Sequence, residues 1–305
     1  MFVSAKILEE LAVFFSQSYK GQNTPSKTHL SFYKAIQKAN AANAWFTKEN
    51  IQFAIENWSH SLNAKNTQKW LKKYTLPNAF SDKTVAVICA GNIPFVGLHD
   101  LLCVILAGHR AIVKCSKKDY FLLAGVVAFL KEQFPELTDR IIFTEGIVSG
   151  SGIDAVIATG SDNTHRYFEY YFSKYPHILR KNRNSVAVLN GTSLKYKHLI
   201  DHPKYKNNYD YQKSIYLLSD IPMLTNDLFL LTPLENNASP IAVLGYEYYD
   251  CLENIADRLK KDQEKIQCIV TDEKIAGAVS FGKSQKPSIS CYSDGVDTLN
   301  FLLTL

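Results

Sequence analysis

The sequence predicts an α/β fold with a doubly wound parallel sheet, on three observations. An apolar run at 85–89 ends in a turn and is followed by an apolar helical stretch that stops at Gly108. A second apolar run, 111–113, then leads to Lys114. Strand–helix–strand units build parallel sheets, whose strands are apolar throughout because both faces are covered. The same alternation continues to residue 190, which is typical of a doubly wound sheet.

Composition indicates an ordinary globular protein. The 305 residues are 46% hydrophobic and 21% charged, and a chain of this length holds one large or two moderate domains. No apolar run approaches the ~20 residues that a membrane helix needs. The apolar pattern at the N-terminus contains Glu9 and Glu10, so it indicates an amphipathic helix rather than a signal peptide. We therefore expect a cytoplasmic protein.

The net charge and the spacing of possible metal ligands limit the classes of ligand that the chain is expected to bind. The net charge of +5 is mild and scattered, which suits phosphate-rich ligands, whereas no basic cluster or motif indicates a nucleic-acid site. The six cysteines form no Cys-Xaa-Xaa-Cys pair, so neither a zinc site nor a disulfide framework is predicted. His198 and His202 are four apart but have no third ligand nearby in the sequence.

The remaining elements follow from apolar periodicity. Residues 1 to about 80 indicate helices, one of them at 51–62 after Thr47 and another containing Trp70. After Lys114 the pattern predicts a helix at 119–134, strands at 141–143 and 155–158, a helix at 162–172 and a strand at 185–189. Beyond residue 191 it predicts short strands at 215–218, 227–231 and 241–244, a helix at 252–261 and a strand at 268–270.

Several blocks resemble a known family. The order strand, Asn92-Xaa-Pro94, apolar helix, Ala-Gly, strand, Lys114-Xaa-Ser116 resembles the aldehyde dehydrogenase superfamily. It is most similar to the acyl-CoA reductase branch, the bacterial luminescence-type fatty acid reductases. A second similar block is the strand that runs into Thr159-Gly160-Ser161. Similarity continues through RYFEYYFSKYPHILRKNRNSVAVLNG, KYKNNYDYQKSIYL, SPIAVLGYEYYD and SQKPSISCYSDGVDTLNFL.

The resemblance implies an architecture and an activity. It implies an aldehyde dehydrogenase-like fold, with N-terminal helices and a Rossmann-like cofactor domain over 1–190. A reduced catalytic lobe would follow at 191–270, and a C-terminal segment at 271–305 would return to that lobe. The implied reaction is NADPH-dependent reduction of a fatty acyl-CoA to an aldehyde through a cysteine acyl-enzyme. The implied assembly is a homo-oligomer.

The resemblance also assigns residues. Asn92 would donate its side-chain amide to the developing oxyanion, a contact commonly worth ~3 kcal/mol; alternatively, it caps the following helix. Lys114 and Ser116 would contact the cofactor. Many NAD-using relatives carry a Glu where this chain has Lys117, which favours the 2′-phosphate of NADPH; a solvated basic turn is the alternative.

The turn formed by Thr159, Gly160 and Ser161 would bind the pyrophosphate, because backbone amides at a helix N-terminus suit anions and Gly160 permits close approach. An ordinary helix cap is the alternative explanation for such a turn.

The catalytic cysteine is the point of departure from the family. It is expected in a glycine-containing segment before the block that starts at Lys204, but the interval here reads GTSLKYKHLIDH. Apolar or acidic surroundings make Cys89, Cys103, Cys251 and Cys268 poor substitutes. Cys115 should point away from Lys114, and relatives need no cysteine at Cys291. The alternative function is therefore a non-catalytic nucleotide-binding relative, either a pseudoenzyme or a subunit.

Overall fold

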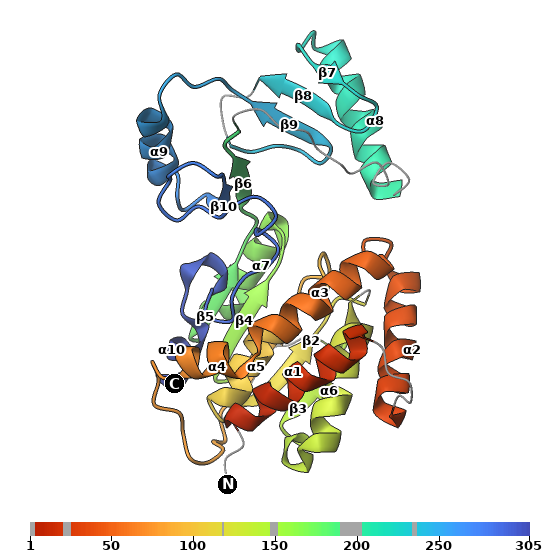
Figure 1. Cartoon of the computed structure of the whole chain (residues 1–305), viewed down its shortest axis with the longest axis vertical. Helices are drawn as coiled ribbons and strands as arrows, with labels where there is room; N and C mark the ends of the chain where they lie inside the picture. Colours follow the sequence, from red (N-terminus) through yellow and green to blue (C-terminus); the bar gives the residue numbers. More distant parts are fainter. Residues whose placement is uncertain (1–3, 21–25, 118, 147–151, 190–202, 234–236) are drawn as a thin grey trace. The chain divides into compact units, whose positions relative to one another are not determined.

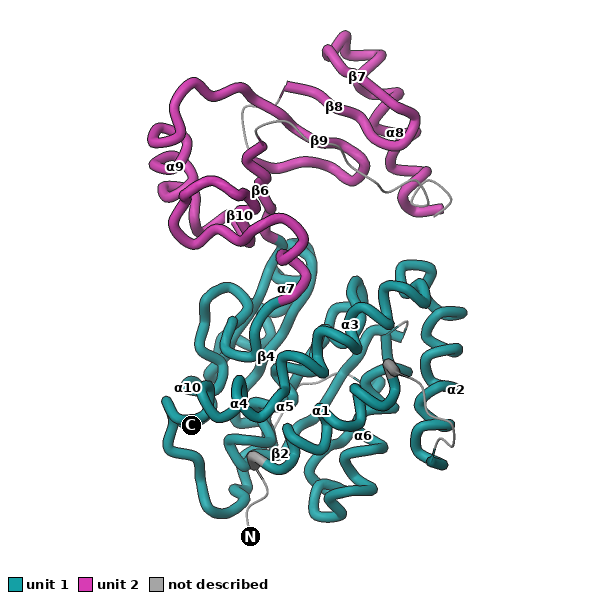
Figure 2. The backbone as a smooth tube through the Cα atoms, viewed as in Figure 1, with its two compact units in different colours: residues 1–182, 287–305 teal, residues 183–286 magenta. Residues whose placement is uncertain are grey.

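The computed structural model describes residues 4–20, 26–117, 119–146, 152–189, 203–233 and 237–305. The chain forms two compact units (Figure 2). The first contains residues 1–182 together with 287–305, and the second contains 183–286. The division therefore falls earlier than residue 190, and the end of the chain belongs to the first unit. Each unit is described by itself.

A five-stranded parallel sheet forms the centre of the first unit (Figure 1). Its order is β3-β2-β1-β4-β5. The strands are β1 (Thr84–Ile88), β2 (Arg110–Lys114), β3 (Ile141–Phe143), β4 (Ala155–Thr159) and β5 (His177–Arg180). The chain moves outward from β1 to β3 and then crosses to β4 on the other side of β1. The doubly wound parallel sheet is thus confirmed, with β5 as a strand that the sequence pattern did not predict.

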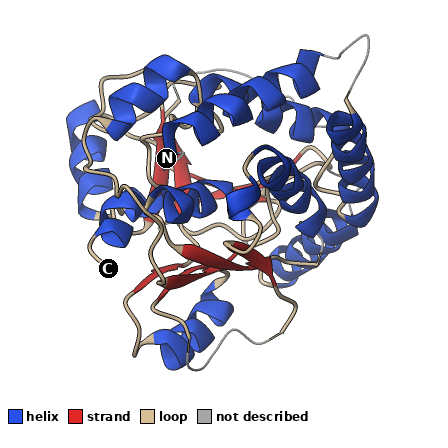
Figure 3. Cartoon of the chain, turned by 90° about the horizontal axis from the view of Figure 1, so that it is seen from below, coloured by secondary structure: helices blue, strands red, loops and turns tan. Residues whose placement is uncertain are grey.

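Helices cover both faces of this sheet. The connections contain α5 (Leu98–Leu106), α6 (Tyr120–Gln133), the 3-10 helix η1 (Pro135–Leu137) and α7 (Asp162–Phe172). Successive strand residues point to opposite faces, so Val85 and Val87 enter the main core with α5 and α6. Ala86 instead packs with Phe172 of α7. Helices and strands of the whole chain are distinguished by colour in Figure 3.

The N-terminal part is helical, as predicted. It comprises α1 (Ser4–Lys20), α2 (Lys27–Ala42), α3 (Lys48–Ser61) and α4 (Ala64–Leu71). Thr47 caps α3 by accepting the Asn50 N–H at 3.2 Å. Helix α2 packs against α6, and Phe14 of α1 stacks on Phe129 of α6 with ring centroids 4.0 Å apart. These contacts extend the core of the sheet into the N-terminal helices.

The last residues complete the first unit. The 3-10 helix η3 (Ser293–Gly295) leads to α10 (Thr298–Leu303), which packs against α5. Asp294 and Gly295 have φ values of 60° and 70°, which fits the turn expected before the final helix. We expected the whole segment 271–305 to return to the second lobe, but residues 287–305 pack in the first unit.

The second unit contains two small sheets. Parallel strands β6 (Asn184–Ala187) and β10 (Ile266–Val270) form one, beside α9 (Leu252–Lys261). The other has β7 (Leu224–Thr225), β8 (Leu230–Pro233) and β9 (Val243–Tyr246), with α8 (Pro203–Leu218) nearby in sequence. The strand predicted at 185–189 therefore exists but pairs with β10. The strand predicted at 215–218 is wrong, because those residues end α8.

Candidate functional site

The predicted site residues follow strands that end at one edge of the sheet. Ile88 of β1 pairs with Lys114 of β2 and with Ala158 of β4, so the three strands end at the same level. The strand order reverses between β1 and β4, and such reversals at the carboxyl ends of parallel strands are where open α/β sheets bind ligands. The segments after β1, β2 and β4 therefore form one candidate site, which we call the carboxyl edge.

The loop after β1 is held by close backbone contacts. A Cβ on Gly91 would lie 2.6 Å from Cβ of Ser116, in the loop after β2. The Asn43 side chain donates to the Gly91 carbonyl at 3.1 Å. Asn92 is exposed in this loop. Helix α5 begins six residues later, at Leu98, and its N-cap is Gly97. Capping therefore does not account for Asn92, whereas its role toward an oxyanion stays a prediction.

The segment after β2 brings positive charge to the same edge. Lys114 and Ser116 are half-buried and Lys117 is exposed, while Lys118 lies outside the described residues. The Ser116 carbonyl accepts the Asp119 N–H at 3.0 Å, which turns the chain into α6. Among the described residues, neither Lys114 nor Lys117 forms an ion pair. Binding of an anionic ligand by these two lysines stays a prediction.

The turn before α7 has a structural explanation of its own. Ser161 caps α7 by accepting the Thr164 N–H at 3.4 Å. A Cβ on Gly160 would lie 2.9 Å from Phe168 and 3.0 Å from Thr164, so the glycine lets the helix pack on the end of β4. Asp162 adds a carboxylate to the first turn of α7 and accepts the Asn182 N–H at 3.2 Å. That charge opposes an anion at this terminus, so pyrophosphate binding by Thr159, Gly160 and Ser161 remains a prediction.

Asp119 is a functional candidate that the sequence pattern missed. It precedes α6 without making a side-chain cap bond, and it is only 2% exposed. Its Oδ1 atom is buried with no hydrogen-bond partner, and its Cβ lies 3.5 Å from the position of a Cβ on Gly91. Burial raises the pKa of Asp119 to about 8. An aspartate before a helix is ordinarily a cap, so the sequence carried no signal of a neutral carboxyl group at the edge.

The cysteines do not supply an evident nucleophile. Cys89 and Cys103 are buried, and burial raises the pKa of Cys103 well above its ordinary value. Cys115 is half-buried and packs against the main core. Cys251 donates to the Glu253 carboxylate at 2.6 Å in the second unit, and Cys291 is exposed. The interval where the family places its cysteine, 191–202, lies outside the described residues.

The part of the chain that the structure describes contains no candidate metal site and no candidate membrane-spanning helix. No cluster of three or more His, Cys, Asp or Glu side chains there could hold a metal ion. No helix among those residues has the length and apolar character needed to span a bilayer.

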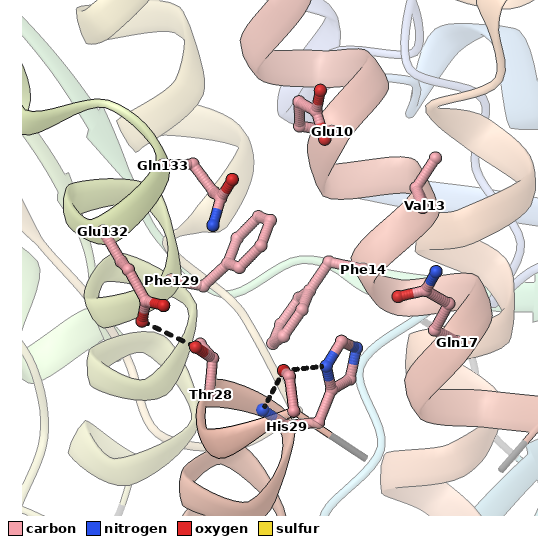
Figure 4. A pocket seen from close by; sticks show the side chains of 10 residues that line it. Glu10, Val13, Phe14, Gln17, Thr28, His29, Phe129, Glu132 and Gln133 are labelled. Carbon is pink, nitrogen blue, oxygen red and sulfur yellow. Dashed lines mark hydrogen bonds between the residues drawn. The ribbon is translucent and has the colours of Figure 1, made fainter. Parts of the chain in front are cut away.

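A cavity of about 380 Å³ lies elsewhere, among α1, α2 and α6 (Figure 4). Thr28 donates to the Glu132 carboxylate at 2.6 Å on one side, and Phe14 and Phe129 stack beside it. Burial lowers the pKa of His29, whose Nδ1 lies 2.8 Å from the Ser26 hydroxyl. None of the predicted site residues lines this cavity. It lies near the end of α6, about 20 Å along the helix from the carboxyl edge.

Comparisons with known proteins agree on the fold. No protein-family profile and no curated protein matches the chain. Aldehyde dehydrogenase 21 from Physcomitrella patens, solved with succinate, matches with a TM-score of 0.54 at 10% identity over 99% of this chain and 86% of that one. Mycobacterium tuberculosis aldehyde dehydrogenase with NAD+ matches with a TM-score of 0.59 at 12% identity, over 91% of this chain and 77% of that one. A Bacillus cereus aldehyde dehydrogenase with NAD+ matches with a TM-score of 0.57 at 12% identity, over 89% of this chain and 72% of that one. The chain therefore has an aldehyde dehydrogenase-like fold.

Proposed function

We propose that this chain is a nicotinamide-dependent oxidoreductase that uses NADPH to reduce an acyl thioester, such as a fatty acyl-CoA, to an aldehyde. The observation that carries the proposal is the carboxyl edge. The loop with Asn92, the segment with Lys114 and Lys117, and the turn before α7 all follow strands that end at one level beside the strand reversal. Structures with the same fold have been solved with NAD+.

The charges at the carboxyl edge fit a phosphorylated dinucleotide. Lys114, the last residue of β2, and Lys117, in the loop that follows, supply two ammonium groups. These would attract the 2′-phosphate of NADPH, whereas a carboxylate at this place would repel it. Apart from the Thr164 N–H, which donates to the Ser161 hydroxyl, the backbone amides of the first turn of α7 have no partners within the helix and can donate to a phosphate oxygen. Asp162 works against this contact, so we assign most of the phosphate binding to the two lysines.

The chain's own side chains would orient the reacting groups. Bound NADPH would supply the hydride. The exposed Asn92 amide is a neutral donor that can stabilise negative charge on a thioester oxygen. Its loop is held by Asn43 and by the contact of Gly91 with Ser116, so the donor has a supported position. The attacking thiol is not assigned to any of the described cysteines.

A non-catalytic nucleotide-binding protein is the second candidate. It is favoured by the absence of cysteine from the interval 191–202. It is also favoured by the burial of Cys89 and Cys103. In this case the carboxyl edge would bind the nucleotide without a following acyl transfer.

Cofactor binding tests what both candidates share. Titration of the protein with NADPH and NADH, followed by nucleotide fluorescence, should give tighter binding of NADPH. Lys117→Glu should weaken NADPH binding by roughly tenfold and reduce the preference over NADH, because an attraction to the 2′-phosphate becomes a repulsion. Lys65→Glu makes the same charge change at an exposed position on α4 and should leave both affinities unchanged.

Turnover separates the two candidates. NADPH oxidation with a long-chain acyl-CoA, accompanied by release of aldehyde and free thiol, would support the reductase. NADPH binding without turnover, and without a covalent acyl adduct in the intact mass, would favour the non-catalytic protein. Failure to bind either nucleotide would overturn both.

A further inference from the structure

Two cysteines occupy matching positions at the ends of neighbouring strands. Ile88 and Lys114 are the last paired residues of β1 and β2. Cys89 directly follows Ile88, and Cys115 directly follows Lys114. The Cys89 N–H donates to the Lys114 carbonyl at 2.9 Å, which continues the ladder by one step. Residues paired across parallel strands point to the same face, and here both side chains pack in the main core.

Their spacing suits a covalent bond. Neighbouring strands lie about 4.8 Å apart, and disulfides join Cα atoms that are roughly 4.4–6.8 Å apart. The backbone therefore needs little movement to bring the two sulfur atoms to bonding distance.

The two thiols differ in access. Cys115 is half-buried, whereas Cys89 is only 7% exposed. The Cys89 Sγ rests against Gly97, where a Cβ would come within 2.1 Å of it. The hydrogen bond with Cys115, together with burial and the nearby Asp100 and Asp119 carboxyl groups, raises the pKa of Cys89 well above its ordinary value. Cys89 is therefore the more protected thiol of the two.

We propose that Cys89 and Cys115 form a reversible disulfide at the carboxyl edge when the protein meets hydrogen peroxide. The Cys115 sulfur attacks the peroxide, an S–O bond forms as the O–O bond breaks, and water leaves, so Cys115 becomes a sulfenic acid. The Cys89 sulfur then attacks the sulfenic sulfur. The S–O bond breaks, the thiol proton leaves with the oxygen as a second water molecule, and the two cysteines have lost two electrons to the peroxide.

The disulfide would link the two loops of the candidate site. Asn92 lies between Cys89 and Gly97, and Ser116 follows Cys115 directly. A bond at this point fixes the ends of β1 and β2 to each other covalently, in addition to the Cys89 N–H bond to the Lys114 carbonyl and the packing contacts already described. The inference concerns thiol chemistry alone and does not depend on the proposed reductase activity.

Mass spectrometry of the full chain tests the pair directly. Treatment with hydrogen peroxide should remove the mass of two hydrogen atoms, and dithiothreitol should restore it. Trypsin should yield residues 84–110 joined to 115–117. Because the larger peptide contains both Cys89 and Cys103, fragmentation must place the link on Cys89. Nucleotide binding need not be measured.

Variants provide the controls. Cys115→Ser should abolish the mass loss, and Cys89→Ser should let Cys115 proceed to the sulfinic acid, which dithiothreitol does not reverse. Cys291→Ser removes an exposed thiol of the same unit and should leave the link intact. Irreversible oxidation of Cys115 in the unmodified chain, or a link through Cys103 or Cys291 instead, would overturn the proposal. Because the unmodified chain is itself decisive, a variant that fails to fold does not remove the test.

Discussion

Asp119 shows how a single residue can couple the carboxyl edge to pH. Its carboxyl group is buried, and one oxygen has no hydrogen-bond partner. Burial favours the neutral form, which raises the folded-state pKa from 3.8 to about 8. Between these two pH values, Asp119 is deprotonated in the unfolded chain but keeps its proton in the folded chain. The contribution of this group to stability is therefore greatest below the unfolded value and is lost as pH rises toward about 8.

Asp119→Asn should make the protein more stable at pH 8 than the unmodified chain, by roughly 3 kcal/mol after allowance for local relaxation. The gain arises because the amide never has to be ionised or desolvated as a charge. The advantage should shrink toward pH 4. Urea unfolding at several pH values measures it. Glu136→Gln, which changes an exposed carboxylate of the same unit, should show no such trend, and an equal gain at all pH values would contradict the explanation.

Arg180 presents the opposite case of a buried charge with partners. Its guanidinium donates to both Asp100 carboxylate oxygens at 2.6 and 2.9 Å and to the Thr298 hydroxyl at 3.0 Å. Burial lowers the pKa of Arg180, but Asp100 outweighs burial and raises the pKa above its ordinary value. The Arg180 guanidinium therefore stays charged, and Asp100 is its buried partner.

Arg180→Met should destabilise the protein by about 3–5 kcal/mol, since it leaves the Asp100 carboxylate buried without a counter-charge. The double variant Arg180→Met/Asp100→Leu should recover much of that loss, because both charges are gone. A double-mutant cycle by chemical unfolding measures the coupling. Additive losses in the double variant would show that the two residues act independently.

At the scale of elements, glycines set how closely the loops approach each other. Gly91→Ala would place a methyl group 2.6 Å from the Ser116 side chain, and Ser116 Cβ cannot rotate away. We expect a loss of about 1–3 kcal/mol from the resulting shift of the loop. Gly146→Ala is the matched control, because its Cβ would meet only Thr144 at an ordinary 3.5 Å. Thermal unfolding of the two variants tests the contact, and equal stability would contradict it.

The sequence predicts the elements whose signals are local. The helices at 162–172 and 252–261 match α7 and α9 to the residue, and the helix predicted after Thr47 is present as α3. Helix α8 was missed because its buried side is made of Tyr205, Tyr209 and Tyr216. These residues follow helical spacing, but tyrosine is also common in strands and on surfaces.

Contacts between segments far apart in the sequence could not be predicted from the sequence. Strand β5 has few apolar residues. The burial of its Arg180 depends on pairing with Asp100, which lies eighty positions away in sequence. The pairing of β6 with β10 likewise joins segments far apart in sequence. At the site, the Asn-Xaa-Pro and Lys-Xaa-Ser segments carried the family resemblance. Nothing local indicated that Asp119 would be buried or that Gly160 would pack on Phe168.

At the scale of the whole molecule, the first unit is assembled from two distant parts of the chain. Leu299 and Leu302 are fully buried, and Ile289 is nearly so. Tyr74 donates to the Asp297 carboxylate at 2.7 Å, and the His109 Nε2 lies 2.9 Å from the Leu302 carbonyl. Residues 287–305 therefore form part of the core that supports the sheet, although the whole second unit separates them from it in sequence.

A shortened chain tests this assembly. Joining residue 182 to residue 287 through a Gly/Ser linker of about ten residues should give a unit that unfolds cooperatively. Residues 1–182 alone should not, because burial of three large apolar side chains contributes about 5–9 kcal/mol, comparable with the stability of a whole domain. Circular dichroism melting and amide hydrogen exchange in α5 measure the difference. The linked chain with Leu299→Asp and Leu302→Asp should behave like 1–182. If 1–182 instead melted as cooperatively as the linked chain, the last residues would be a surface addition, and the sheet with its carboxyl edge would fold without them.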